Sequence, residues 1–118
     1  MKRCNFVLCL LLIIAVAGCS NVALQPVSHS NASQQLLAQA EVAQQSGDIS
    51  GAISHVERAV RIEPRNAYAW HTLATLQLAA GNINKAEQFA RRSNQYAAGN
   101  QALIEKNQKV MDEVTRLR

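Results

Sequence analysis

The sequence predicts an all-α fold built from helical hairpins. From about residue 34 onward, apolar residues recur at three- and four-residue steps, which is the period of an amphipathic helix. The same kind of break in this pattern occurs twice, at Gly47-Asp48-Ile49 and at Gly81-Asn82-Ile83. No segment alternates apolar and polar residues with the period of two that a half-buried strand requires. We therefore expect five helices joined by short turns, and no sheet.

Each expected helix has its own apolar stripe. The first helix, from about residue 34, has one face formed by Leu36, Ala40 and Ala43. The four later stripes share the same helical spacing. In chain order they consist of Ala52, Ile53, Val56, Ala59 and Val60; Trp70, Leu73, Ala74 and Leu78; Ala86, Phe89, Ala90 and Tyr96; and Leu103, Val110, Met111, Val114 and Leu117.

Helix stop and start signals separate the stripes. Gly47 can adopt the left-handed conformation that ends a helix, and Asp48 or Ser50 can cap the next one. Pro64 stops the second helix, and Asn66 can cap the third. The same signals recur at Gly81 with Asn82 and Asn84, and at Gly99-Asn100.

The helices form a repeat. Gly47 and Gly81 are separated by the same interval as Ala52 and Ala86, and this interval equals the period of about 34 residues that tetratricopeptide repeats have. The helix–turn–helix content agrees with that family as well. Residues 33–100 resemble two such repeats, and the resemblance implies a short right-handed α-solenoid. The expected units are repeats 33–66 and 67–100 and a capping helix 101–118, which together form a domain over 34–118.

Helix packing explains several of the residues that match the repeat pattern. Other residues depart from that pattern. Small residues such as Ala52 and Ala86 stand where two helices must approach closely, and Trp70 can fill a larger gap. Pro64 stands at the proline position of the family. In the second repeat Ala98 replaces that proline, and Gln77 replaces the usual aromatic residue.

The N-terminal residues resemble a bacterial lipoprotein signal peptide. Two basic residues precede an apolar run from Phe6 to Ala17, which is shorter than the roughly 20 residues of a transmembrane helix. The run ends in Val16-Ala17-Gly18-Cys19, which is similar to a lipobox. The resemblance implies that residues 1–18 are removed and that Cys19 carries a diacylglyceryl group and an N-terminal acyl chain, such as palmitate. Ser20 in place of Asp implies the outer membrane, with the inner membrane as the alternative.

A tether would join this anchor to the helices. Residues 19–33 lack a clean period and contain Pro26 with several Ser and Asn residues, which is typical of a flexible linker. Fully extended, this segment would reach on the order of 45 Å at about 3.3 Å per residue.

Composition disfavours several classes of function. Cys4 and Cys9 lie in the leader, and lipid would block Cys19, so no thiol remains for a disulfide or a metal. The three histidines lack metal-ligand spacing, and no nucleophile stands in a recognisable motif with a base. The basic residues are scattered and aromatic residues are few, which disfavours nucleic-acid binding. We expect no enzyme, no cofactor, no metal and no small-molecule substrate.

The repeat resemblance also implies a binding surface. Members of the family bind partners on the concave face, which the first helix of each repeat lines. Tyr68 and His71 are the strongest candidates for partner contacts, and ordinary helix packing is the alternative for both. The groove positions carried over are Gln34, Leu37, Glu41, Gln44 and Gln45; Tyr68, His71, Thr75, Leu78 and Ala79; and Glu105, Lys109 and Asp112.

Together these resemblances predict a lipid-anchored periplasmic adaptor that binds an envelope protein or peptide segment. Small lipoproteins of similar layout activate bifunctional penicillin-binding proteins, which synthesise peptidoglycan. Two alternatives stay open: a pilotin-like assembly factor for type IV pili or their secretin, and a structural lipoprotein that self-associates through its last helix. The clamp of the family for chaperone C-termini requires Lys, Asn and Arg at groove positions, and these are absent.

Overall fold

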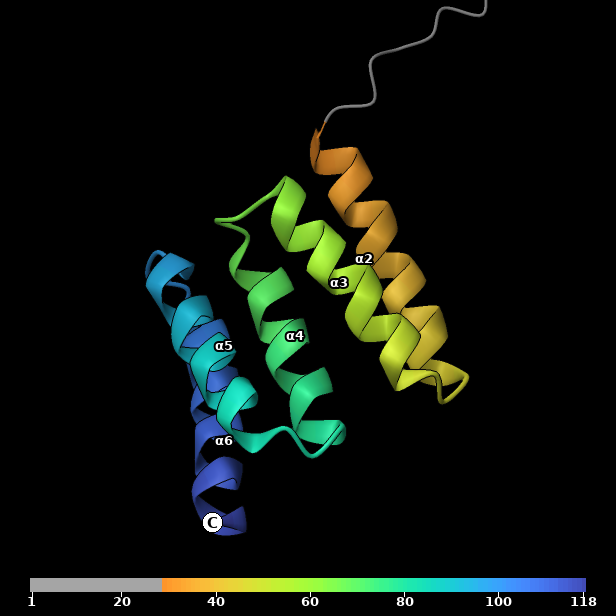
Figure 1. Cartoon of the computed structure of the whole chain (residues 1–118). Helices are drawn as coiled ribbons and strands as arrows, with labels where there is room; N and C mark the ends of the chain where they lie inside the picture. The colour runs from red at the N-terminus through yellow and green to blue at the C-terminus, as the bar shows by residue number, and fades with distance from the viewer. Residues whose placement is uncertain (1–28) are drawn as a thin grey trace, which may run out of the picture.

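Five helices make up the described part of the chain, which is residues 29–118 of the computed structural model (Figure 1). Cys19 and the expected signal peptide lie outside the described residues. No strand occurs between residues 29 and 118, so the all-α expectation is confirmed. The helices are α2 (His29–Gln45), α3 (Ile49–Ile62), α4 (Ala67–Ala79), α5 (Ile83–Tyr96) and α6 (Gln101–Leu117).

The helices form two hairpins and a closing helix. In the first hairpin α2 packs against α3, and in the second α4 packs against α5. Contacts between α3 and α4 join the hairpins, and α6 covers the second hairpin by packing on α5 and α4 (Figure 1). Each helix therefore contacts only its near neighbours, which is the arrangement of an α-solenoid.

The first helix of the structure begins earlier in the sequence than we expected. We expected a tether up to residue 33, but α2 starts at His29, and Ser33 is fully buried. Ser33 precedes the buried residues Leu36 and Ala40 by three and seven positions, so it extends their stripe by one turn. A serine does not register as apolar, which is why the hydrophobic pattern missed this turn.

Most of the expected helix caps are confirmed. The Asp48 carboxylate accepts a hydrogen bond from the Gly51 amide at 2.8 Å, and the Asn66 and Asn100 side chains cap α4 and α6 at 3.1 Å. Asn82 is the exception, because it makes no side-chain cap to α5. Its amide instead donates to Oε1 of the buried Gln77 at 2.8 Å.

Backbone conformation explains one departure from the repeat pattern. Gly81 ends α4 with a φ of +79°, as expected for a helix-terminating glycine. Ala98 has a φ of +47°. A proline ring holds φ at about −65°. Proline therefore cannot stand at this position in the second repeat, and the turn between α5 and α6 differs from the turn at Pro64.

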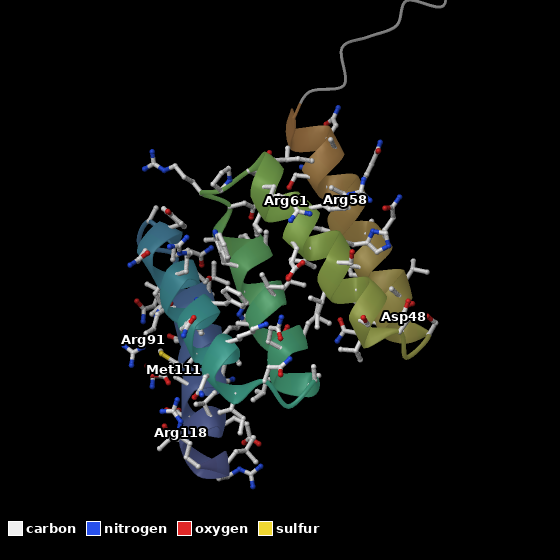
Figure 2. All side chains as sticks on the ribbon, viewed as in Figure 1. Asp48, Arg58, Arg61, Arg91, Met111 and Arg118 are labelled. Carbon is white, nitrogen blue, oxygen red and sulfur yellow. The ribbon has the colours of Figure 1, made fainter. Side chains whose placement is uncertain are left out.

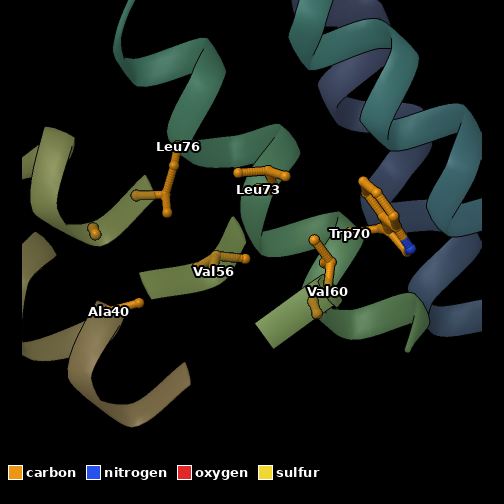
Figure 3. Packing of buried hydrophobic residues seen from close by; sticks show 8 residues of the cluster. Ala40, Val56, Val60, Trp70, Leu73 and Leu76 are labelled. Carbon is orange, nitrogen blue, oxygen red and sulfur yellow. The ribbon is translucent and has the colours of Figure 1, made fainter. Parts of the chain in front are cut away.

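The main core joins the two hairpins. Figure 3 shows Val56 and Val60 of α3 facing Leu73, Leu76 and Trp70 of α4. Small residues fill the closest helix contacts, as expected, and several of them are fully buried, namely Ala52, Ala59, Ala69, Ala74, Ala86 and Ala90. Burial of this apolar surface between the hairpins is the main force that holds them together.

The closing helix covers the second hairpin. Leu103, Val110 and Val114 are buried against residues of α4 and α5. These side chains, which the structural-lipoprotein alternative assigns to self-association, already have partners within the monomer. The end of α6 is also tied to α5, because Arg118 bonds to Glu87 and Asn84. Hydrogen bonds from Arg91 and Arg118 lower the pKa of the Glu87 carboxyl below its ordinary value.

Candidate protein-interaction surface

The predicted groove residues come from α2, α4 and α6, and they differ in exposure. Leu37 is half-buried and packs against the main core, and Thr75 donates its hydroxyl to the Thr72 carbonyl at 2.8 Å. His71 is also half-buried. Leu78 is half-buried too, and the other predicted groove residues are exposed, namely Gln34, Glu41, Gln44, Gln45, Tyr68, Ala79, Glu105, Lys109 and Asp112.

The structure brings together only part of this predicted groove. Residues on α4 and α6 adjoin, because these two helices are in contact. By contrast α2 packs on α3 and has at most marginal contact with α4. The five predicted positions on α2 therefore have little direct contact with those on α4 and α6. We define the candidate site, the α4–α6 surface, as Tyr68, His71 and Thr75 of α4, of which Tyr68 and His71 bond to the cap residue Asn100 and to Asn107 of α6. The predicted groove residue Lys109 lies about 200° around α6 from Asn107 and is therefore not part of this surface.

Tyr68 is an exposed aromatic residue held in a fixed place. Its side chain is 54% exposed. The Asn100 amide donates a hydrogen bond to the Tyr68 hydroxyl at 2.9 Å. Asn100 is itself fixed, because its side-chain oxygen caps α6. The ring of Tyr68 thus stands at the border of α4 and α6 with its hydroxyl anchored and much of its surface open to a partner.

His71 is bound to α6 through a buried asparagine. The distance between His71 Nδ1 and Asn107 Oδ1 is 2.7 Å. Asn107 is fully buried, and its amide nitrogen donates to Ser93 Oγ and to Asn94 Oδ1, each at 2.7 Å. The Ser93 hydroxyl in turn donates to the Ala67 carbonyl at 2.8 Å. This network joins α4, α5 and α6 at one point.

The network also determines the tautomer of His71. Both donors of the Asn107 amide are engaged, so its oxygen must accept, and His71 Nδ1 must carry the proton. In the neutral imidazole, Nε2 is then the acceptor nitrogen. Nδ1 of His71 thus serves helix packing, whereas Nε2 has no hydrogen-bond partner among the described residues.

The α4–α6 surface presents side-chain groups that can bind a peptide. It offers an aromatic ring and an imidazole acceptor, and these can hold an apolar side chain and a hydrogen-bond donor of a peptide. Among residues 29–118, no cluster of three or more His, Cys, Asp or Glu residues could hold a metal ion. No helix in the same range is long and apolar enough to cross a membrane.

Besides Ser33, sequence reasoning missed the burial of three further polar residues. Ser93 and Asn107 lie on the apolar stripes of α5 and α6, and Gln77 lies in α4. The only signal for Asn107 is its position between Leu103 and Val110, where the helical period requires a buried residue. A polar residue at such a position indicates a hydrogen-bonded network.

The fold and this surface define a class of protein: a helical-repeat scaffold for protein–protein interaction, of the kind that is typically non-catalytic. Comparison with known families supports this assignment. Residues 43–106 match the model of a tetratricopeptide repeat family. The chain belongs to the tetratricopeptide repeat family.

A solved structure is also similar to this chain. It is the globular C-terminal domain of P. aeruginosa LpoP, which is 35% identical to this chain over the matched part. The match covers 72% of this chain and 80% of that domain, with a TM-score of 0.70. A comparison with curated protein sequences found no match.

Proposed function

We propose that this protein is a lipid-anchored adaptor that faces the periplasm from the outer membrane and binds one envelope protein through its α4–α6 surface. Three observations support the proposal. The chain has the repeat fold of interaction modules, it resembles a lipoprotein around Cys19, and its described domain follows an N-terminal segment. The matched structure is the globular C-terminal domain of LpoP.

The observation that best supports the proposal is that the Tyr68 ring is exposed while its hydroxyl is held by a hydrogen bond from Asn100. An aromatic side chain that is already held in one orientation loses little conformational entropy when a partner covers it. Aromatic residues of this kind are enriched among the few that supply most of the binding energy at protein interfaces. Binding here requires no chemical step, and the adaptor is not an enzyme.

For the partner we propose a bifunctional penicillin-binding protein, whose peptidoglycan synthesis the adaptor activates. The similarity to small lipoproteins of this layout supports this choice. A single short solenoid presents one face, which is enough to engage one domain of a synthase. Two other outcomes are open to the same experiment: recovery of a pilus secretin, or recovery of only further copies of this chain.

We expect Tyr68→Ala to weaken partner binding by about 2 kcal/mol, or roughly 30-fold in Kd, since an anchored aromatic residue at the centre of an interface is a typical hot spot. Full-length protein is used as bait with detergent-solubilised envelopes, and the recovered partner is then titrated. The rate of glycan polymerisation by the recovered synthase is measured with and without the adaptor.

The matched control for this experiment is Val42→Ala, which truncates an apolar side chain on α2 that is 66% exposed. It lies outside the α4–α6 surface and should leave both binding and activation unchanged. Equal recovery of the partner by wild type and Tyr68→Ala would contradict the proposed surface. Binding of a synthase without acceleration of synthesis would contradict the activator role alone.

The proposed anchor has its own test at Cys19. We expect Cys19→Ser to abolish labelling of the protein by radioactive palmitate and to leave residues 1–18 attached, since the thiol is the acceptor of the lipid. Intact-mass analysis of membrane fractions measures both effects. Cys9→Ser is the control and should change neither. A wild-type protein that retains its leader and carries no acyl chain would contradict the anchor and leave the α4–α6 surface untouched.

A further inference from the structure

A second feature of the surface lies outside the predicted groove. A hollow of about 440 Å³ opens along α5 above the side chain of Trp70. None of the residues that line it belongs to the α4–α6 surface, and all but Trp70 come from α5. The lining consists of Trp70, Gln88, Phe89, Arg91, Arg92 and Gln95.

The base of the hollow is aromatic and rigid. The ring centroids of Trp70 and Phe89 are 5.5 Å apart, and the rings are tilted by 38°. Trp70 Nε1 donates to the Pro64 carbonyl at 2.8 Å, which prevents the indole from turning. The indole is only 9% exposed, so a small part of its surface is available beside Phe89, which is half-buried.

The guanidinium of Arg92 lies over this aromatic base, and its N–H donors have no partner among the described residues. Its guanidinium carbon is 5.1 Å from the Trp70 ring centroid. Within the described residues Arg92 has no salt bridge and no side-chain hydrogen bond. The neighbouring Arg91 differs, because its guanidinium bonds twice to Glu87, at 3.1 and 2.8 Å. Stacking on an indole holds the planar guanidinium in place and leaves its edges for a carboxylate.

The neighbouring surface has an excess of positive charge. Arg58 and Arg61 of α3 are exposed (Figure 2), and Arg91 and Arg92 of α5 are exposed as well. The exposed Arg65 follows Pro64, whose carbonyl holds Trp70. No salt bridge involves Arg58, Arg61 or Arg65 among residues 29–118. The acidic residues on α3 and its following turn are Glu57, which is half-buried, and Glu63, which bonds to Asn66.

We propose that this hollow binds an acidic segment of a protein partner, with a carboxylate on the Arg92 guanidinium and a neighbouring apolar side chain against Trp70 and Phe89. Charge complementarity defines the occupant, since an aromatic base beneath an uncommitted arginine suits alternating acidic and apolar residues. A flexible chain can enter a hollow between helices, whereas a flat bilayer surface meets only the outermost side chains. The site is independent of the α4–α6 surface.

The single tryptophan of the chain, Trp70, provides the readout. The full-length protein is placed in phosphatidylcholine nanodiscs and titrated with the blocked hexapeptide Glu-Leu-Glu-Glu-Leu-Glu while Trp70 emission is recorded. We expect a saturable change that weakens as salt is added. The same peptide with Gln in place of each Glu should give no response. No saturable change with the acidic peptide at millimolar concentration, or equal binding of the Gln peptide, would overturn the proposal.

A matched pair of variants locates the contact. Arg58 and Arg92 occupy the same position in the two repeats, but only Arg92 stacks on an aromatic ring. We expect Arg92→Gln to weaken peptide binding about tenfold and Arg58→Gln to change it less than about twofold, because only Arg92 offers an oriented pair of donors. Isothermal titration checks the affinities independently of fluorescence. Equal losses from the two variants would mean diffuse electrostatic attraction and would overturn the site.

The alternative ligand for this hollow is an anionic lipid surface. One further experiment tests this alternative. The nanodiscs are remade with phosphatidylglycerol, and Trp70 emission is compared between wild type and Arg92→Gln. We expect no difference that depends on Arg92. An Arg92-dependent change with the anionic lipid, together with no response to the acidic peptide, would assign this face to the membrane. Binding of partners at Tyr68 is unaffected by either result.

Discussion

Replacement of Asn107 by alanine is expected to lower the free energy of unfolding by about 3 kcal/mol, from the combined cost of a small cavity and of buried polar groups left without partners. Asn107 is fully buried and bonds to His71, Ser93 and Asn94, which lie on both helices of the second hairpin. Its removal leaves the Ser93 hydroxyl without the donor that it accepts from. The loss therefore weakens the docking of α6 on the second hairpin.

The repeat suggests a compensating double variant. One repeat earlier, the positions equivalent to Asn107 and Ser93 are Leu73 and Ala59, and both are buried. We expect Asn107→Leu combined with Ser93→Ala to return stability to within about 1 kcal/mol of wild type. The double variant removes both fully buried polar side chains of the network, while the remaining partners His71 and Asn94 are only half-buried and can bond to water. Asn107→Leu alone should be less stable than the double variant.

Urea unfolding measures these effects as a shift in the midpoint at constant m-value. The control is Gln108→Ala, which removes an exposed amide next to Asn107 on the same helix. It should cost less than about 0.5 kcal/mol, as is usual for a surface substitution. An Asn107→Ala protein as stable as this control would show that the network contributes nothing to the docking of α6.

Leu73→Ala is expected to have an effect of similar size through a different mechanism. Leu73 is 1% exposed and lies in the core cluster that joins the two hairpins (Figure 3). Truncation of a buried leucine removes apolar contacts and leaves a cavity, at a cost of about 3 kcal/mol. For a domain of this size the midpoint of thermal unfolding should fall by roughly 15 °C. Circular dichroism measures the change.

The same truncation at an exposed position serves as the control. Leu117 is 47% exposed near the end of α6, so Leu117→Ala should cost less than about 1 kcal/mol. If both variants lost the same stability, Leu73 would not be part of the contact between the hairpins. A fall in the m-value of Leu73→Ala would show instead that the two hairpins no longer unfold together.

Local features of the sequence were sufficient for most of the fold. The stop at Gly81 and the caps at Asp48, Asn66 and Asn100 each depend on side chains within three residues, and the structure has all four. The two expectations that were wrong, the start of α2 and the cap at Asn82, both concern polar side chains that tertiary contacts hold. Asn82 has a buried partner in Gln77, and no cap signal indicates that preference.

The candidate site was predictable only in part. Repeat positions placed Tyr68 on an exposed face correctly, because exposure on a helix follows from the same period that buries the opposite side. They also placed the α2 positions in the same groove, and the structure shows at most marginal direct contact between α2 and α4. The stacking of Arg92 on Trp70 joins residues on two different helices, and no short-range pattern reports it.

The sequence by itself determined the number and order of the helices, the repeat of the helical hairpin and the apolar face of each helix, since the period, the caps and the helix-ending residues act within one or two turns. Only the tertiary structure decided which polar residues are buried as partners. His71 and Asn107 are 36 residues apart, and their hydrogen bond exists only after α6 has docked on the second hairpin. A buried amide requires a partner, and it is the packing of the helices that selects which one.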